Sequence, residues 1–175
     1  MTTATTTALP SVDNQIDITR TGRKEWTLTA TCRIEKPRDE VFAFFAEAHN
    51  LQRITPRSVR FRILTEPPIE MKAGAIIDYA LKVRGIPIRW RTEITKWNPP
   101  FGFTDTQIKG PYHVWEHEHR FEELDAGTAT LMTDTVRYRP RGGALVNRLF
   151  VERDVRWIFG YRNTVITGVL CAENI

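Results

Sequence analysis

Residues 144–171 read ALVNRLFVERDVRWIFGYRNTVITGVLC, and this stretch decides the fold. Its apolar residues recur at the spacing of one helix face, and no proline interrupts it. A single helix of about 28 residues would run roughly 40 Å, because an α-helix rises about 1.5 Å per residue. A helix of that length can cross a whole β-sheet. The sequence therefore predicts a sheet that packs against this helix.

The chain before that helix alternates between apolar and polar residues with the period of β-strands. Residues 26–34 (WTLTATCRI) alternate strictly, which predicts a half-buried strand. Six more strands are expected between residues 58 and 139, separated by short turns. Because short turns join them, strands that follow one another in the sequence are expected to pair antiparallel.

Two short helices are expected between the first and second strands. Pro37 is suited to a first helical position, and the acidic Asp39 and Glu40 follow in the first turn. A second short helix is expected around residues 49–54, ending before Pro56. The predicted fold class is α+β, with a seven-stranded antiparallel curved sheet wrapped around the long C-terminal helix.

Length and composition indicate one globular domain with a tail. Residues 1–24 are rich in threonine and are expected to form a flexible N-terminal tail, and residues 25–172 a single domain. The net charge of +4 is too small to indicate a nucleic-acid partner. The chain has no apolar run long enough for a membrane span and does not begin like a signal peptide. Cys32 and Cys171 are far apart and are expected to be reduced thiols, so the predicted location is the cytoplasm.

Residues 110–121, GPYHVWEHEHRF, carry the most informative polar pattern. As a strand, this stretch would turn one side toward the helix, namely His113, Trp115, His117, His119 and Phe121. Burying polar groups is costly unless they pair or face water. In paired strands, a residue that points inward must lie opposite another residue that points inward. Asp134 is therefore expected opposite either His117 or His119. Either pairing places a carboxylate beside an imidazole.

Several local motifs accompany this order of elements. They are Pro37-x-x-x-Val41-Phe42, Leu51-x-x-Ile54-Thr55-Pro56, Pro87-x-x-Trp90-x-Thr92-x-Ile94, Pro99-Pro100-x-x-Phe103-x-Asp105-x-Gln107, Gly110-Pro111-Tyr112-x-x-Trp115-x-His117-x-His119-x-Phe121, Gly127-Thr128, Asp134-x-Val136-x-Tyr138-x-Pro140 and Ile158-Phe159-x-Tyr161-Arg162. Over residues 26–171 the chain resembles the START/Bet v 1-like superfamily of helix-grip proteins, often called SRPBCC, and within it a bacterial-type ligand-binding branch.

The resemblance implies a cavity between the sheet and the long helix, used for binding or transport of a small hydrophobic ligand such as a lipid, a quinone or a polyketide-like compound. The residues expected to contact that ligand are Tyr79, Trp90, Phe103, Asp105, Gln107, His113, Trp115, His117, His119, Phe121, Asp134, Tyr138 and Phe159. Aromatic residues would form the walls, and the polar residues would anchor one end of the ligand.

Alternative functions use the same residues. A cyclase-like, aromatase-like or hydrolase-like enzyme would use a His–Asp pair as general base, with His117, His119 and Asp134 as catalytic candidates. A metal bound by His117 and His119, with Asp134 as third ligand, is less favoured than a hydrogen-bonded network because the HxH pattern is common by chance. No metal and no cofactor is therefore assigned. A protein-interaction module with a self-filled cavity is the remaining alternative.

Basic residues on the outer sheet face are the last feature that bears on partners. Arg60, Arg62, Arg84, Arg89 and Arg91 are expected to lie on neighbouring strands. We interpret them as a solvated sheet face, with transient contact with an anionic membrane surface as a secondary hypothesis. Nucleic acid is not an expected partner, because the aromatic residues that stack on bases are predicted to point inward. The oligomeric state stays open.

Overall fold

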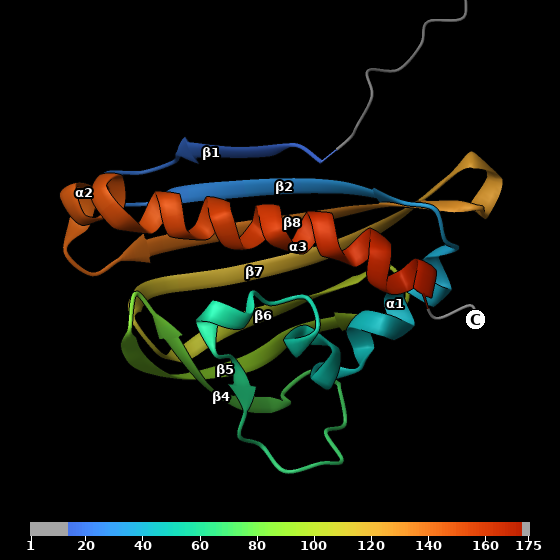
Figure 1. Ribbon diagram of the computed structural model, residues 1–175, viewed down its shortest axis with the longest axis horizontal. Coiled ribbons are helices and arrows are strands. Elements are labelled where there is room, and N and C mark those ends of the chain that lie inside the picture. Colours follow the sequence, from blue (N-terminus) through green and yellow to red (C-terminus); the bar gives the residue numbers. More distant parts are fainter. Residues whose placement is uncertain (1–13, 173–175) are drawn as a thin grey trace, which may run out of the picture.

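The computed structural model describes residues 14–172, and the side chains of residues 14–170. Eight strands form one antiparallel sheet in the order β1-β2-β8-β7-β6-β5-β4-β3. Their bounds are β1 (Ile16–Arg20), β2 (Trp26–Ile34), β3 (Arg62–Ile63), β4 (Ile76–Val83), β5 (Ile86–Asn98), β6 (Gly102–Lys109), β7 (Tyr112–Leu124) and β8 (Ala129–Pro140). The sheet curves around the C-terminal helix (Figure 1), as the alternating sequence predicts.

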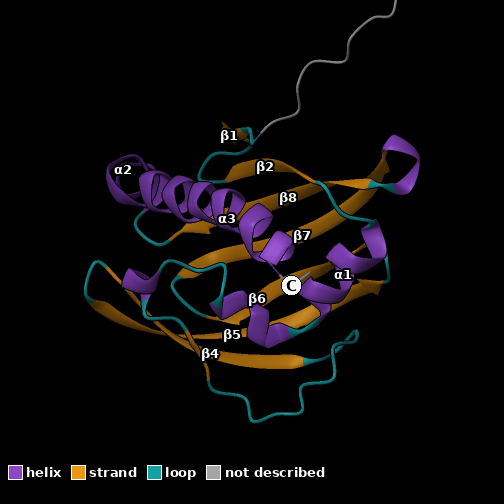
Figure 2. Ribbon diagram, turned by 45° about the vertical axis from the view of Figure 1, so that its right-hand side comes forward, coloured by secondary structure: helices purple, strands orange, loops and turns teal. Residues whose placement is uncertain are grey.

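The long C-terminal helix is confirmed, with one irregularity. It consists of α2 (Gly143–Val146), a π-helical segment η4 (Asn147–Val151) and α3 (Glu152–Ala172), which follow one another without a break. The two expected short helices are α1 (Arg38–Ala46) and the 3₁₀ helix η1 (Ala48–Gln52). Further 3₁₀ turns are η2 (Arg57–Val59) and η3 (Asp125–Gly127). Figure 2 shows α3 and α1 on the same side of the sheet.

Two apolar clusters form the core. One surrounds α1 and includes Phe42, Phe121 and Ile166, which brings α1, β7 and α3 together. The other lies under α3 and includes Leu28 and Phe159. The helix packs mainly over β1, β2 and β8, so it leaves the side of the sheet formed by β4 to β7 less covered.

The expected tail requires a correction at its C-terminal part. Residues 16–20 form β1, which pairs antiparallel with β2 from Ile16 opposite Ala30 to Arg20 opposite Trp26. Ile16 and Ile18 pack against the second apolar cluster, so burial of these two side chains stabilises a strand that the polar composition had hidden. Residues 1–13, the rest of the expected tail, lie outside the described residues.

The strand expected from residue 58 is much shorter than its pattern suggests. Residues 57–59 form η2, and Arg60 follows with φ 47°, in the left-handed region that few non-glycine residues adopt. Only Arg62 and Ile63 pair with β4. In residues 14–172, no helix is both long enough and apolar enough to cross a membrane.

Candidate functional site

A cavity of about 400 Å³ lies between the curved sheet and the C-terminal helix. Strands β4 to β7 form one wall, the C-terminal helix the other, and α1 and η1 close one end. The lining is mainly aliphatic and aromatic. Of the residues predicted from the sequence, it contains Tyr79, Trp90, Phe103, Asp105, Trp115, His117, His119 and Phe159. The alternative considered from the sequence, a cavity filled by the protein's own side chains, therefore does not describe this fold.

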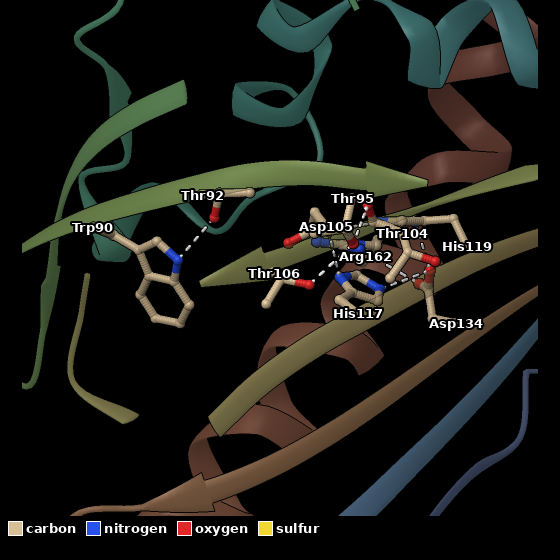
Figure 3. Close-up of polar contacts among 10 residues, drawn as sticks. All are labelled: Trp90, Thr92, Thr95, Thr104, Asp105, Thr106, His117, His119, Asp134 and Arg162. Atoms are coloured by element: carbon tan, nitrogen blue, oxygen red, sulfur yellow. Dashed lines mark hydrogen bonds and ion pairs between the residues drawn. The ribbon is translucent and has the colours of Figure 1, made fainter. Parts of the chain in front are cut away.

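Two imidazoles on β7 share one carboxylate on β8. His119 lies opposite Asp134 in the register of these strands. Nε2 of His117 donates a hydrogen bond to Oδ1 of Asp134 at 3.0 Å. Nδ1 of His119 lies 2.9 Å from the same oxygen, although its direction does not satisfy hydrogen-bond geometry. The sequence left open which histidine would meet Asp134, and in the structure both do (Figure 3).

A second carboxylate, on β6, meets the same two rings from the cavity side. Nε2 of His119 donates a hydrogen bond to Oδ2 of Asp105 at 3.2 Å. Nδ1 of His117 lies 3.4 Å from that oxygen. Both imidazoles and Asp105 line the cavity, whereas Asp134 is fully buried behind the rings. The two histidines therefore lie between Asp105, which lines the cavity, and Asp134, which is buried behind the rings.

Arg162 on α3 completes this cluster. Its Nη1 donates a hydrogen bond to Oδ2 of Asp134 at 3.4 Å, and its guanidinium lies over the ring of Phe159, 4.8 Å from the ring centroid. The exposed fraction of Arg162 is only 7%. A buried guanidinium needs an anion beside it, and Asp134 is that anion. The long helix and the sheet are thus joined by a buried ion pair next to the cavity.

The pKa values of this cluster move in opposite directions. Burial lowers the pKa of His117, and the neighbouring His119 lowers it further. Burial also acts to lower the pKa of His119, but Asp134 and Asp105 outweigh it and the net shift is upward. For Asp134, burial acts to raise the pKa, but His117 and His119 outweigh it and hold the pKa well below its usual range. The cluster therefore favours one neutral imidazole, one imidazolium and an ionised Asp134.

The histidine rings are also packed by aromatic neighbours. The ring of His119 stacks on Phe103, with 4.1 Å between centroids, and the ring of His117 meets Phe159 edge-on at 5.4 Å. The two imidazoles lie 3.8 Å apart, centroid to centroid. Packing on both sides fixes their rotamers, so the polar groups are held in place before any ligand arrives.

The opposite end of the cavity is formed by three aromatic side chains. Trp90 and Trp115 pack edge to face with centroids 5.2 Å apart, and Tyr112 lies 4.7 Å from Trp115 and 5.6 Å from Trp90. The indole N–H of Trp90 donates a hydrogen bond to Oγ1 of Thr92 at 3.0 Å. Because that polar group is already bound, the faces of these rings offer an apolar surface.

Two predicted ligand residues do not reach the cavity. His113 is exposed, because β7 contains a bulge between Tyr112 and Val114 that leaves His113 without a partner on β8. One extra residue reverses the alternation, so Tyr112 points inward in its place. Gln107 instead closes the turn between β6 and β7: its Nε2 donates to the backbone oxygen of Tyr112 at 2.9 Å, and its Oε1 accepts from the backbone N–H of Tyr112 at 3.3 Å.

Three other predicted residues lie behind the wall instead of in it. Phe121 belongs to the core cluster around α1, and its exposed fraction is 1%. Tyr138 is fully buried and stacks on Trp26, with 6.2 Å between centroids. Asp134 supports the histidine rings, as described above. These residues shape the site without lining it.

Tyr112 and Arg162 are among the cavity-lining residues that were not predicted from the sequence. Tyr112 was assigned to the outer face by simple alternation, and only the Gly110–Pro111 turn directly before it could have suggested an irregular start to the strand. Arg162 resembles any charged residue of an amphipathic helix. Its position three residues after Phe159, one turn along the same helix face, was the available signal.

Comparison with known proteins agrees with the observed fold. The sequence profile of the family described as "Polyketide cyclase / dehydrase and lipid transport" matches residues 34–159. Comparison with curated proteins gives no match.

Several solved structures are similar. Protein Ms6760 from Mycobacterium smegmatis aligns with a TM-score of 0.67 at 18% identity, covering 91% of this chain and 100% of that one. The Zhui aromatase/cyclase from Streptomyces sp. R1128 aligns with a TM-score of 0.66 at 17% identity, covering 83% and 93%. The ginseng major latex-like protein 151 from Panax ginseng aligns with a TM-score of 0.58 at 14% identity, covering 79% and 94%. These likenesses confirm the expected helix-grip fold.

Proposed function

The chain belongs to the polyketide cyclase/dehydrase and lipid transport family, and we propose that it binds a small hydrophobic molecule with one polar end. The observation that carries this proposal is a cavity of about 400 Å³ with mainly apolar walls and a buried polar cluster formed by His117, His119 and Asp105. Pockets that hold drug-sized ligands measure roughly 300–1,000 Å³ and share this composition. A lipid, a quinone and a polyketide-like compound all have such a structure.

The two ends of the cavity suggest how the ligand lies. Trp90, Tyr112 and Trp115 supply aromatic faces for the apolar body. The polar end would lie against the hydrogen-bonded pair of His119 and Asp105, where the Asp105 carboxylate can accept a further hydrogen bond from a ligand hydroxyl. A molecule that filled the cavity would bury its apolar surface against the aromatic end, which is the main favourable contribution to binding.

Filling the cavity tests this proposal. Ile88 lines the cavity, so Ile88→Trp places a large ring where the ligand would lie. Ile108→Trp is the matched control, because Ile108 is 53% exposed on β6 and does not line the cavity. We expect dansyl-undecanoic acid to bind the wild type and the control with equal, saturable fluorescence changes, and Ile88→Trp to bind at least about tenfold more weakly.

Equal binding by all three proteins would contradict the proposal, and so would the absence of binding to the wild type combined with no co-purified molecule. Native mass spectrometry of freshly purified protein checks the second case. It would show the mass of any molecule that remains in the cavity, and that mass distinguishes a lipid from a quinone or a polyketide-like compound.

A second candidate function is proton-transfer catalysis of the cyclase or dehydratase type. One observation favours it: both imidazoles contact carboxylates and line the cavity, so a bound substrate would meet a general base. The distinguishing result is a His119→Ala variant that still binds a substrate but no longer converts it. A wild type that binds such substrates and converts none of them would favour the binding function alone.

A further inference from the structure

We infer that Asp105, His117 and His119 form a binding site for one divalent transition-metal ion in the wall of the cavity. This inference rests on the geometry of the three side chains and is independent of the proposed hydrophobic ligand. It also differs from the metal site considered from the sequence, in which Asp134 was the third ligand.

The donor atoms of these residues converge. Oδ2 of Asp105 lies 3.2 Å from Nε2 of His119 and 3.4 Å from Nδ1 of His117. One ligand atom from each of the three residues lies within 4.8 Å of the others. In a tetrahedral site with metal–ligand bonds of about 2.1 Å, neighbouring ligand atoms are separated by about 3.4 Å. The two distances from Asp105 therefore already match the spacing that an ion between the side chains would require.

Asp134 occupies the position of an outer-shell partner. In most metal sites, the second ring nitrogen of a histidine ligand faces a carboxylate or carbonyl, which fixes the tautomer and orients the ring. Here Nε2 of His117 donates to Oδ1 of Asp134 at 3.0 Å, and Nδ1 of His119 lies 2.9 Å from the same oxygen. The nitrogens that remain, Nδ1 of His117 and Nε2 of His119, are the two that face Asp105.

The kind of ion follows from the donor set. Two imidazole nitrogens and one carboxylate oxygen suit Zn²⁺ or Fe²⁺ and are poor ligands for Mg²⁺ or Ca²⁺, which prefer oxygen. Asp105, His117 and His119 all line the cavity, so the remaining coordination position would open into it. The proton that now lies between His119 and Asp105 would be displaced, because only the deprotonated nitrogen can bind a metal.

The protein offers a clean test because it has only four histidines. Neither His49, which is half-buried on η1, nor His113, which is exposed, lines the cavity, so the double variant His49→Ala/His113→Ala keeps His117 and His119 as its only imidazoles. Tag-free protein, stripped with a chelator, would be titrated with Zn²⁺ by calorimetry and with Co²⁺ by visible absorption. We expect one ion per chain in the wild type and in the double variant, with the intense Co²⁺ bands of a site that has fewer than six ligands.

Removing the carboxylate tests its role. In Asp105→Asn we expect Zn²⁺ affinity to fall at least about 100-fold, because an amide is a much poorer ligand than a carboxylate. Glu118→Gln is the matched control, since Glu118 is exposed on β7 between the two histidines, and it should bind like the wild type. In Asp134→Asn, loss of the outer-shell partner should weaken binding roughly 10–100-fold.

Three results would overturn the inference. They are the absence of a saturable Zn²⁺ site in the wild type, loss of the site in the His49→Ala/His113→Ala variant, and unchanged affinity in Asp105→Asn. If a variant in the cluster does not fold, the double variant still decides the question. The ring ¹⁵N signals of both imidazoles must shift when one equivalent of Zn²⁺ is added, and unshifted signals would exclude the site.

Discussion

Arg162 on the C-terminal helix and Asp134 on β8 form an ion pair that is buried between helix and sheet, with 3.4 Å between Nη1 and Oδ2. Asp134 also receives the hydrogen bond of His117. One carboxylate therefore holds the helix against the sheet and orients a ring of the candidate site. Stability and site geometry depend on the same side chain.

Replacing that carboxylate should destabilise the fold. In Asp134→Asn the buried guanidinium of Arg162 loses its counter-charge, and removing one partner of a buried pair typically costs about 3–5 kcal/mol. Urea unfolding followed by circular dichroism would measure the change. Asp17→Asn on the exposed face of β1 is the matched control and should change the free energy of unfolding by less than about 0.5 kcal/mol. A similar loss in both variants would contradict the assigned role.

The same carboxylate should make stability fall in acid. The pKa of Asp134 is held well below its ordinary value of 3.8 in the folded protein, so below that pH the unfolded chain takes up a proton that the folded chain does not. Its contribution is complete above about pH 5 and is lost as the pH falls toward the lowered pKa. We expect the difference in unfolding free energy between wild type and Asp134→Asn to shrink from pH 5 to pH 3. A difference that stays constant would refute this.

The pKa of His117 should lie below that of an ordinary imidazole, and the pKa of His119 should lie above it. In the metal-free His49→Ala/His113→Ala variant, NMR would follow His117 and His119 alone. Because the pKa of His117 is lowered by burial and by its neighbour, its ring should remain neutral below pH 6.5. Because Asp134 and Asp105 outweigh burial at His119, that ring should remain protonated above pH 6.5. Two superimposable titration curves centred near pH 6.5 would contradict this assignment.

Gly102 should tolerate no side chain. A Cβ at this position, where φ is +158°, would lie 2.2 Å from the backbone oxygen of His119 on the neighbouring strand. Gly102→Ala should therefore displace β7 under the histidines and destabilise the protein by about 1–3 kcal/mol or more. Gly168→Ala provides the contrast, because a Cβ there meets nothing within 4 Å, and alanine should stabilise the exposed helix by up to about 1 kcal/mol. Equal midpoints of thermal unfolding for Gly102→Ala and Gly168→Ala would contradict this prediction.

Cys32 should be unreactive in the folded protein. It is fully buried, and burial together with the charge of Asp134 raises the pKa of its thiol to about 12. Only the thiolate reacts quickly with disulfide reagents. In a Cys171→Ser variant, we expect no release of thionitrobenzoate from Ellman's reagent at pH 8 until urea unfolds the chain. Rapid reaction under native conditions would show that β2 is accessible.

The sequence predicted the parts of the fold in which each residue's environment follows from its neighbours. Residues 26–34 alternate without exception and form β2 with the expected bounds. The C-terminal helix follows from its periodic apolar face. By contrast, β1 is short and polar, and it is stabilised by pairing with β2 and by the burial of Ile16 and Ile18, which local composition does not reveal.

The site was predictable only up to the register of its strands. Parity placed Asp134 beside the histidine pair, and the structure agrees. The alternation of inward and outward residues could not predict the side to which His113 points, because a single unpaired residue reverses that alternation. It also could not show that Asp105 would reach the rings from the opposite side to Asp134, since that depends on how β6 lies against β7.

The bulge at His113 divides the cavity wall into two parts that can vary separately during evolution. Tyr112, before the bulge, belongs to the aromatic end, and His117 and His119, after it, belong to the polar end. Because the bulge absorbs the change of alternation within one residue, substitutions before it can reshape the space for the ligand's body while the histidine pair keeps its place opposite β8. A lineage could thus change the size of ligand it accepts without rebuilding the polar cluster.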